Sequence, residues 1–161
     1  MRKTRIVLGG MFLVLVALAL AMIPQRASSR TVTISGQDAN ADAIPAYHTS
    51  VPEGPLPATM NPSTFTEPVV QNAYRLASRI RKVLYQQPCY CHCDRSQGHG
   101  SLLDCYVSKH AAECGVCLQE DFYAYEQVHK GKSAVQIREG IESGDWKKVD
   151  LNKYQSRSIA K

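Results

Sequence analysis

Apolar residues along the chain follow three patterns, and each pattern predicts a different kind of segment. Ile6 to Ile23 is an 18-residue run without a charged residue. Residues 28–62 show no sustained hydrophobic period of 2 or 3.6. From residue 63 onwards, apolar residues recur mainly at the three- and four-residue spacing of amphipathic helices. The chain therefore predicts an apolar N-terminal segment, an irregular spacer and a mainly α-helical domain.

The longest predicted helix covers residues 66–86. It begins at Thr-Glu-Pro (66–68), which supplies a capping hydroxyl and then an acid and a proline for the first turn. It is expected to end before Pro88, because a proline disfavours helical geometry in the residue that precedes it. This helix therefore leads the chain directly to Cys89.

Two further helices are predicted downstream. One starts near Cys114 and ends at Gly131, and the next is capped by Ser133 and Gln136, which have the spacing of a capping box. The stretch 102–109 is short and ambiguous. Together these patterns predict small, mostly helical elements rather than a sheet.

The domain limits follow from these changes of pattern. We expect a cysteine-rich helical domain at 63–150 and a loose tail at 151–161. The proline-rich residues 28–62 are expected to be a flexible tether, because this composition buries too little apolar surface to order itself. The core of the domain is small, so stapling by a metal or by disulfides is expected.

Residues 1–27 are predicted to be a signal peptide or a transmembrane anchor. Arg2, Lys3 and Arg5 precede the apolar run, which is longer than a usual signal-peptide core and close to the shortest bilayer span. This charge asymmetry predicts export. The protein would be membrane-anchored and face outside the cytoplasm, or would be periplasmic or secreted if the signal is cleaved.

The formal charge of +5 comes largely from the N-terminus. Five Lys and Arg residues and no acid precede residue 31, whereas residues 63–161 contain 14 basic and 11 acidic residues. A nucleic-acid footprint requires a basic patch on the folded part. We therefore expect no nucleic-acid partner, and we expect the membrane to be contacted through the N-terminal segment.

The candidate chemistry lies in six cysteines that all fall within 29 residues. They are Cys89, Cys91, Cys93, Cys105, Cys114 and Cys117. In an extended backbone the three thiols of the Cys-x-Cys-x-Cys run share one face. A Cys-x-x-Cys pair at the start of a helix places its two thiols one turn apart, where they can chelate one ion.

These thiols, flanked by His99 and His110, predict a metal site. Thiolates bind soft or borderline ions and imidazole suits Cu and Zn, so Cu(I) is the first choice of ion and Zn the second. Six thiols exceed one tetrahedral site, and a second metal or a Cu(I) thiolate cluster would use the surplus. The two histidines are expected to be auxiliary ligands or to support the ligands.

Two alternatives remain open from the residues alone. An even number of cysteines in an oxidising compartment is also typical of three disulfides, although their crowding would leave the first helix and the tail unstapled. Cys114 and Cys117 also have the spacing of a thiol–disulfide redox pair at a helix start, where a thiol pKa is lowered. No βαβ pattern surrounds that pair, and no Ser/His/Asp arrangement or phosphate loop is visible.

The motif also resembles that of a known family. Pro-Cys-Tyr-Cys-x-Cys, a histidine before Ser-Leu-x-Asp-Cys, and His-x-x-x-Cys-x-x-Cys are similar to the bacterial PCYCGC-motif family, well over 88–117 and loosely over 118–141. The resemblance implies a small exported protein, often a lipoprotein, of unestablished function and with metal binding as a candidate role. Two departures are His92 in place of the usual glycine and the missing lipobox cysteine. The matching positions are Pro88, Cys89, Tyr90, Cys91, Cys93, His99, Ser101, Leu102, Asp104, Cys105, His110, Cys114 and Cys117.

The sequence thus predicts an exported, non-catalytic metal-binding protein. A metal donor or acceptor protein is the expected partner. Storage, delivery and sensing of the metal are not separated by these patterns.

Overall fold

Residues 43–156 are described by a computed structural model, and all regular elements among them are helical. This part of the chain contains no strand, which confirms the prediction of a mainly α-helical, cysteine-rich domain. None of its helices is long and apolar enough to cross a bilayer. The predicted signal or anchor at 1–27 lies outside the described residues, as do residues 28–42 and 157–161.

Two helices occupy the stretch predicted as a single helix over 66–86. They are α2 (Pro68–Arg79) and α3 (Arg81–Leu84), separated at Ile80, whose φ of −116° and ψ of 24° depart from helical values. One side of α2 is buried, in agreement with its amphipathic pattern. The pattern therefore predicted the helical stretch and its buried face, but not the interruption.

Two predicted N-terminal helix caps can be compared with the structure, and one of them is confirmed. At α7 (Ala134–Glu142), the Gln136 amide N–H donates to the Ser133 hydroxyl at 3.3 Å and the Ser133 N–H donates to the Gln136 side chain at 3.0 Å, so the capping box is confirmed. At α2 the N-cap residue is Glu67, and the Thr66 hydroxyl donates to the Glu67 carboxylate at 2.7 Å. The predicted threonine cap is therefore wrong.

The cysteine-bearing part of the chain folds into short helices joined by tight turns. These are α4 (Cys93–Gln97), α5 (Leu102–Val107) and the 3₁₀ turn η2 (His110–Glu113), which leads through Cys114 to α6 (Gly115–His129). Cys114 is the N-cap residue of α6. The helix predicted over 114–131 is therefore present. It ends two residues before the predicted end, which is a usual uncertainty for helix limits.

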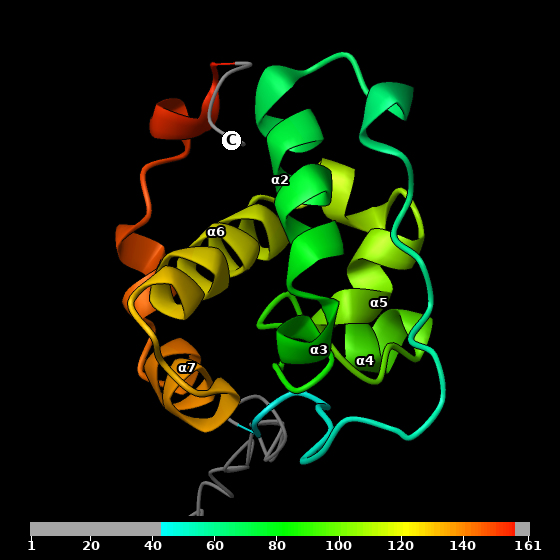
Figure 1. Ribbon diagram of the computed structural model, residues 1–161, viewed down its shortest axis with the longest axis vertical. Coiled ribbons are helices and arrows are strands. Elements are labelled where there is room, and N and C mark those ends of the chain that lie inside the picture. The colour runs from blue at the N-terminus through cyan, green and yellow to red at the C-terminus, as the bar shows by residue number, and fades with distance from the viewer. Residues whose placement is uncertain (1–42, 157–161) are drawn as a thin grey trace, which may run out of the picture. The chain divides into compact units, whose positions relative to one another are not determined.

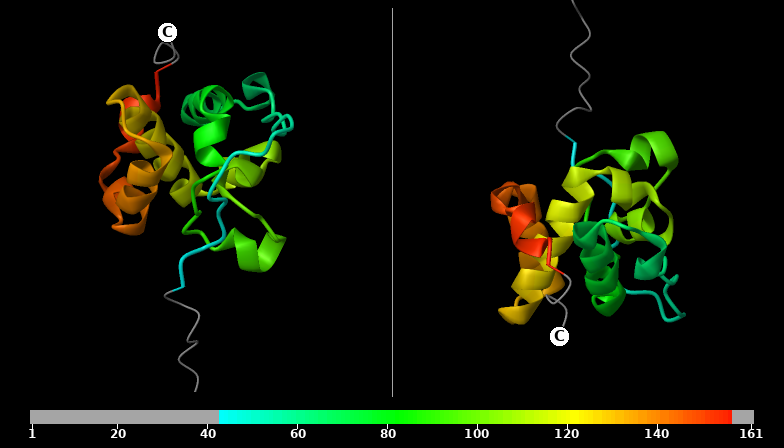
Figure 2. Two further views of the ribbon diagram at one scale, coloured as in Figure 1. Left: turned by 60° about the horizontal axis from the view of Figure 1, so that its bottom comes forward. Right: turned by 90° about the horizontal axis from the view of Figure 1, so that it is seen from above.

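The helices form two layers, best seen from the side (Figure 2). Helices α2 to α5 make one layer, and α6, α7 and the C-terminal turns make the other (Figure 1). Helix α6 contacts both, because it packs on α2 and on α7. The remaining 3₁₀ turns are η1 (Pro62–Thr64), η3 (Asp145–Lys148) and η4 (Leu151–Tyr154).

The core between the layers is rich in aromatic rings. Tyr74 of α2 and Tyr106 of α5 meet edge to face at 4.9 Å between ring centroids, and both are fully buried. Buried tyrosines need partners for their hydroxyls. Tyr74 donates to the Ser108 carbonyl at 2.6 Å and Tyr106 to the Cys117 carbonyl at 2.9 Å. The core therefore fixes the backbone on both sides of η2.

The described part of the predicted tether makes contacts with the helices. Residues 43–61 run beside α3 and α5 towards η1 (Figure 1). The Met60 N–H donates to the Tyr106 carbonyl at 2.9 Å, and the ring of His48 stacks on that of Tyr85 at 3.9 Å. Leu56 and Met60 pack against the core. Composition alone did not predict this, because an extended segment can dock with few apolar residues.

The start of the predicted loose tail is also packed. Tyr154 of η4 stacks on Phe122 at 3.7 Å between ring centroids. The side-chain amide of Asn72, fully buried in α2, donates to the Tyr154 carbonyl at 2.8 Å. Residues 151–156 therefore extend the core beyond the expected limit at 150.

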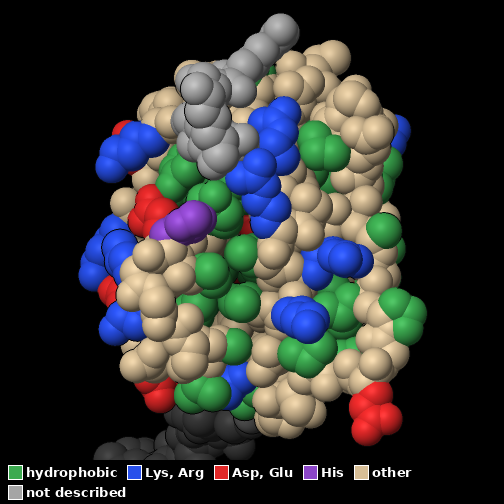
Figure 3. Space-filling model, in the orientation of Figure 1, with side chains coloured by type: hydrophobic (Ala, Val, Ile, Leu, Met, Phe, Trp, Pro, Cys, Tyr) green, Lys and Arg blue, Asp and Glu red, His purple; other side chains and the backbone are tan. Residues whose placement is uncertain are grey.

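One face of the surface is shown in Figure 3. Lys and Arg side chains lie there in several separate places, with apolar and neutral side chains between them. Acidic side chains lie mostly at the margin of this face. The balanced charge expected for residues 63–161 thus corresponds to mixed charges on this face.

Candidate metal centre

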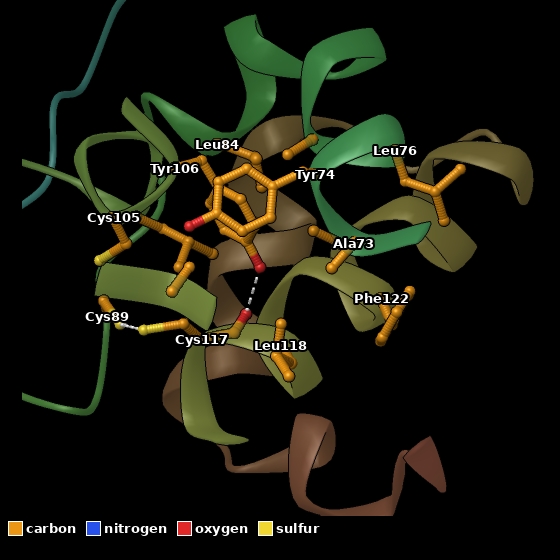
Figure 4. Packing of buried hydrophobic residues seen from close by; sticks show 14 of the residues in the cluster. Ala73, Tyr74, Leu76, Leu84, Cys89, Cys105, Tyr106, Cys117, Leu118 and Phe122 are labelled. Carbon is orange, nitrogen blue, oxygen red and sulfur yellow. Dashed lines mark hydrogen bonds between the residues drawn. The ribbon is translucent and has the colours of Figure 1, made fainter. Parts of the chain in front are cut away.

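The sulfur atoms of five cysteines converge at one end of the hydrophobic core. The shortest Sγ–Sγ distances are 3.3 Å for Cys93 and Cys105, 3.4 Å for Cys89 and Cys91, and 3.5 Å for Cys89 and Cys117. Figure 4 shows Cys89, Cys105 and Cys117 together at the edge of the aromatic packing. In the described part of the chain all six cysteines are free thiols.

A turn, and not a strand, presents the Cys-x-Cys-x-Cys run. The His92 N–H donates to the Cys89 carbonyl at 3.0 Å, and His92 itself has φ 55° and ψ 34°, in the left-handed region. The expectation of an extended backbone with a shared face is therefore wrong. The three thiols still converge, because the left-handed residue reverses the chain between Cys91 and Cys93.

Both predicted histidines reach the sulfur cluster. His99 Nδ1 lies 3.3 Å from the Cys105 sulfur, and His110 Nε2 lies 3.7 Å from the Cys91 sulfur. Their rings are 5.1 Å apart between centroids. His48, His92 and His129 belong to none of the groups of donors described next.

Three overlapping groups of four donors have the geometry to hold a metal ion. Within each group, the four donor atoms all lie within 4.8 Å of one another. Cys105 belongs to all three groups, so it is the centre of the arrangement. The groups are Cys89, Cys91, Cys93 and Cys105; Cys91, Cys105, His110 and Cys117; and Cys93, His99, Cys105 and His110.

Cys114 is the predicted site residue that belongs to none of these groups. It lies one turn before Cys117, at the N-cap of α6, and is partly exposed. Its thiol nevertheless interacts with those of Cys117 and Cys91. Cys114 therefore stands beside the cluster, on the side where Cys91 is also partly exposed.

The thiols influence one another's ionisation. Neighbouring thiols, Cys117 and then Cys89, hold the pKa of Cys105 well below its ordinary value, at about 3. The same interactions raise the pKa values of Cys89 and Cys117. The hydrogen bond to Cys105 is the largest cause of each increase. The lowered pKa favours Cys105 as an acceptor of hydrogen bonds from Cys117 and Cys89. A thiolate at the centre of the cluster would favour a cation there.

Two buried acids behind the cluster were not identified from the sequence. Glu120 accepts the Tyr90 N–H at 2.8 Å, and burial raises the pKa of Glu120 to about 8. Asp121 is fully buried, and neither of its carboxyl oxygens has a hydrogen-bond partner among the described residues. The Leu118 to Val128 pattern gave no signal for them, because burial of an acid depends on neighbouring elements.

The structure thus brings together seven of the eight predicted site residues. The core positions them, since the Gln87 carbonyl accepts the Leu102 N–H at 2.9 Å and the Tyr106 hydroxyl binds the backbone of Cys117. The first contact joins the start of the cysteine run to α5. The second joins α5 to α6. The result is a Cys/His cluster positioned to hold a metal ion.

Comparison with known proteins gives one match. The family model described as "Protein of unknown function with PCYCGC motif" matches residues 25–148. No curated protein matches the chain. No solved structure matches it either.

Proposed function

The chain belongs to the family of proteins of unknown function with the PCYCGC motif, and we propose that it is an exported, non-catalytic metal-binding protein with Cu(I) as its first ion and Zn as its second. The family description names no activity. The proposal therefore depends on the donor cluster. Its ligands would come from the six cysteines, with His99 and His110 as auxiliary donors.

The observation that supports the proposal best is the spacing of the donors. Metal–sulfur bonds of about 2.3 Å in a tetrahedron place the sulfurs roughly 3.8 Å apart. The sulfur–sulfur distances in the cluster, from 3.3 Å for Cys93 and Cys105 to 3.7 Å for Cys91 and Cys117, are close to that edge. Burial within a packed core holds the thiols at these distances, so little reorganisation is needed on binding.

The excess of thiols over imidazoles favours Cu(I) over Zn. Five thiols and two imidazoles surround one small volume, and soft thiolate ligands select Cu(I) among the common ions. Zn also accepts sulfur and nitrogen donors in a tetrahedron. Neither ion requires a redox or hydrolytic role, and we therefore propose binding without catalysis.

Location and partners follow from the N-terminal sequence and from the exposed edge of the cluster. The basic start and the apolar run favour an exported protein held at the membrane. Cys91, His110 and Cys114 are partly exposed, whereas Cys89, Cys93, Cys105 and Cys117 are buried. An exposed edge suits exchange of the ion with a donor or acceptor protein.

The decisive experiment is elemental analysis of the full chain, purified in mild detergent without a metal-affinity tag, together with a thiol count after denaturation. Bound metal and six thiols support the proposal. Absence of metal together with absence of thiols would instead support the alternative of a disulfide-stapled domain. A metal-free protein whose Cys114 and Cys117 alone cycle between thiol and disulfide would support the redox alternative.

A variant at Cys91 sharpens this test. Cys91→Ser removes one soft ligand and keeps the backbone path, and a hydroxyl does not replace a thiolate on Cu(I). We expect metal content to fall sharply, whereas His129→Ala, outside the donor groups, should keep it. If Cys91→Ser retains its metal, or only gains one reactive thiol, the proposal is wrong.

A further inference from the structure

One thiol differs from the other five in its relation to the donor groups. Cys114 belongs to none of the three groups found among the described residues, whereas each of the other five cysteines belongs to at least one. The Cys114 thiol still interacts with those of Cys91 and Cys117. A metal site that is complete without Cys114 would therefore leave this thiol available beside two of the candidate ligands.

The neighbours of Cys114 show which group it adjoins and where that group meets solvent. Cys91 and Cys117 both belong to the group that Cys105 and His110 complete. Cys91 and Cys114 are the two partly exposed cysteines, and the other four are buried. His110 of the same group is also partly exposed. The pair of Cys91 and Cys114 therefore connects solvent with the buried thiols.

The chain leaves room for an approaching molecule beside this pair. Cys114 is the N-cap residue of α6, and Gly115 after it is exposed. Apart from the neighbours of Gly115 in the chain and in α6, no described residue lies within 4 Å of the position that a Cβ at Gly115 would take. A donor atom of another molecule can therefore reach this end of α6 without displacing a side chain.

We propose that Cys114 is the exchange ligand of the metal centre: an incoming Cu(I) ion binds Cys114 and Cys91 first and then passes to the group that contains Cys91 and Cys117. This inference rests on the proposed metal-binding function and adds the residue through which the ion enters and leaves. The outside donor would be a thiolate or another soft group, because such groups compete with cysteine for Cu(I).

The step is a ligand substitution in which no electron is transferred. The bond between Cu(I) and the outside donor breaks as a bond to the Cys114 sulfur forms, and the Cys114 proton passes to the leaving donor or to water. A ligand that acts only during exchange lowers the barrier for loading and for release by the same amount. Its loss therefore changes both rates and leaves the affinity for the ion unchanged.

The test is the rate of Cu(I) transfer between bicinchoninate, whose absorbance reports its bound Cu(I), and the full chain, reduced and in mild detergent. Cys114→Ser should keep the Cu(I) count and the equilibrium position of this competition. It should slow transfer in both directions by roughly tenfold, which corresponds to about 1.4 kcal/mol in the barrier. Ala112→Ser adds the same hydroxyl at a partly exposed position of η2 and is the matched control, which should exchange at the parent rate.

Two results for Cys114→Ser would overturn the exchange role and leave metal binding intact. Unchanged transfer rates would mean that the ion enters by another route. A lower Cu(I) count or a weaker hold on the ion would mean that Cys114 is a resident ligand. A parent chain that binds neither Cu(I) nor Zn would instead remove the proposed function itself.

Alkylation with iodoacetamide tests the same assignment without a substitution, and so does not depend on the folding of Cys114→Ser. In the Cu(I)-loaded chain we expect Cys114 to react, as located by peptide mass mapping, and the other five thiols to be protected by the ion or by burial. The alkylated chain should keep its Cu(I) and exchange it slowly. Protection of Cys114 together with the other five thiols would make it a resident ligand and overturn the proposal.

Discussion

At the scale of single residues, His92 has the least favourable backbone conformation. Its φ of 55° is the only positive value outside glycine among residues 43–156, and left-handed geometry costs a residue with a Cβ about 1–2 kcal/mol. Its Nδ1 is buried without a hydrogen-bond partner in the described part of the chain. This conformational cost falls on the turn that presents the cysteine run.

His92→Gly is therefore expected to stabilise the metal-free domain. Relief of strain exceeds the entropy that glycine adds to the unfolded chain, and we expect a gain of about 1 kcal/mol in the free energy of unfolding. Urea unfolding under reducing conditions measures it. His92→Ala is the control, since it also loses the ring but keeps a Cβ. Equal stability of the two variants would show that the backbone conformation is not costly.

Asp121 gives a second prediction at this scale. Burial raises the pKa of Asp121 well above its ordinary value of 3.8. The folded state thus binds a proton that the unfolded state has released, and stability falls as pH rises from about 4 through the folded pKa. Asp121→Asn stays neutral at every pH, so its advantage over the parent protein should grow as the pH rises above about 4.

The measurement is urea unfolding of both proteins at several pH values, with reductant and chelator present. The advantage should increase by up to about 1.4 kcal/mol per pH unit over the range where the carboxyl is ionised only in the unfolded state. Glu139→Gln changes an exposed carboxyl on α7 and is the control. A pH-independent difference for Asp121→Asn would contradict the burial argument.

At the scale of elements, the sequence correctly predicted helix starts and ends that are set by neighbouring residues in the chain. The capping box at Ser133, the helix after Cys114 and the end of helix before Pro88 depend on residues close in sequence, and the structure has all three. The interruption at Ile80 and the turn at His92 depend on packing against other elements. No spacing rule contains that information, so both were missed.

The cluster shows the same division between local and long-range information. The residue types indicated a metal site, because thiolates and imidazoles are the ligands of soft and borderline ions. Their grouping was not predictable, since Cys89 meets Cys117 only after α6 has packed on the first layer. The buried Glu120 was likewise invisible, because its partner is the Tyr90 backbone on another element.

The extended segment 43–61 gives a prediction at the element scale. Leu56 and Met60 pack on the core, and the Arg81 guanidinium donates to the Leu56 carbonyl at 3.1 Å. A chain that starts at Ser63 loses these contacts. We expect it to be less stable by about 2–4 kcal/mol than one that starts at residue 43, from the apolar area alone.

Thermal unfolding of the two truncated chains checks this. A loss of this size lowers the midpoint by several degrees or more in a domain of about 100 residues. Leu56→Ser with Met60→Ser, in the longer chain, is the matched variant and should account for most of the loss. Equal melting of the chains starting at 43 and 63 would show that the segment acts only as a tether.

At the scale of the whole molecule, the cluster joins elements that are otherwise held by a small core. Its donors come from the turn before α4, from α4, from the loop between α4 and α5, from α5, from η2 and from the first turn of α6. Helix α6 belongs to the second layer (Figure 2). A metal bound at this place would link the two layers through Cys117 and the groups around Cys105.

Metal removal should therefore destabilise the whole domain and not only the loop of the cluster. A ligand that binds only the folded state adds about 4 kcal/mol when its concentration is 1,000 times the dissociation constant, and in small sites the free energy of metal binding becomes free energy of folding. We expect the Cu(I)- or Zn-loaded chain to melt well above the chelator-treated chain. Hydrogen exchange should slow in both α2 and α6 on loading, because bound metal would fix Cys105 and Cys117 on either side of Tyr106. Loaded and metal-free protein that melt together, or protection confined to residues 89–99, would mean that the metal sits at the edge of a core that is already complete without it.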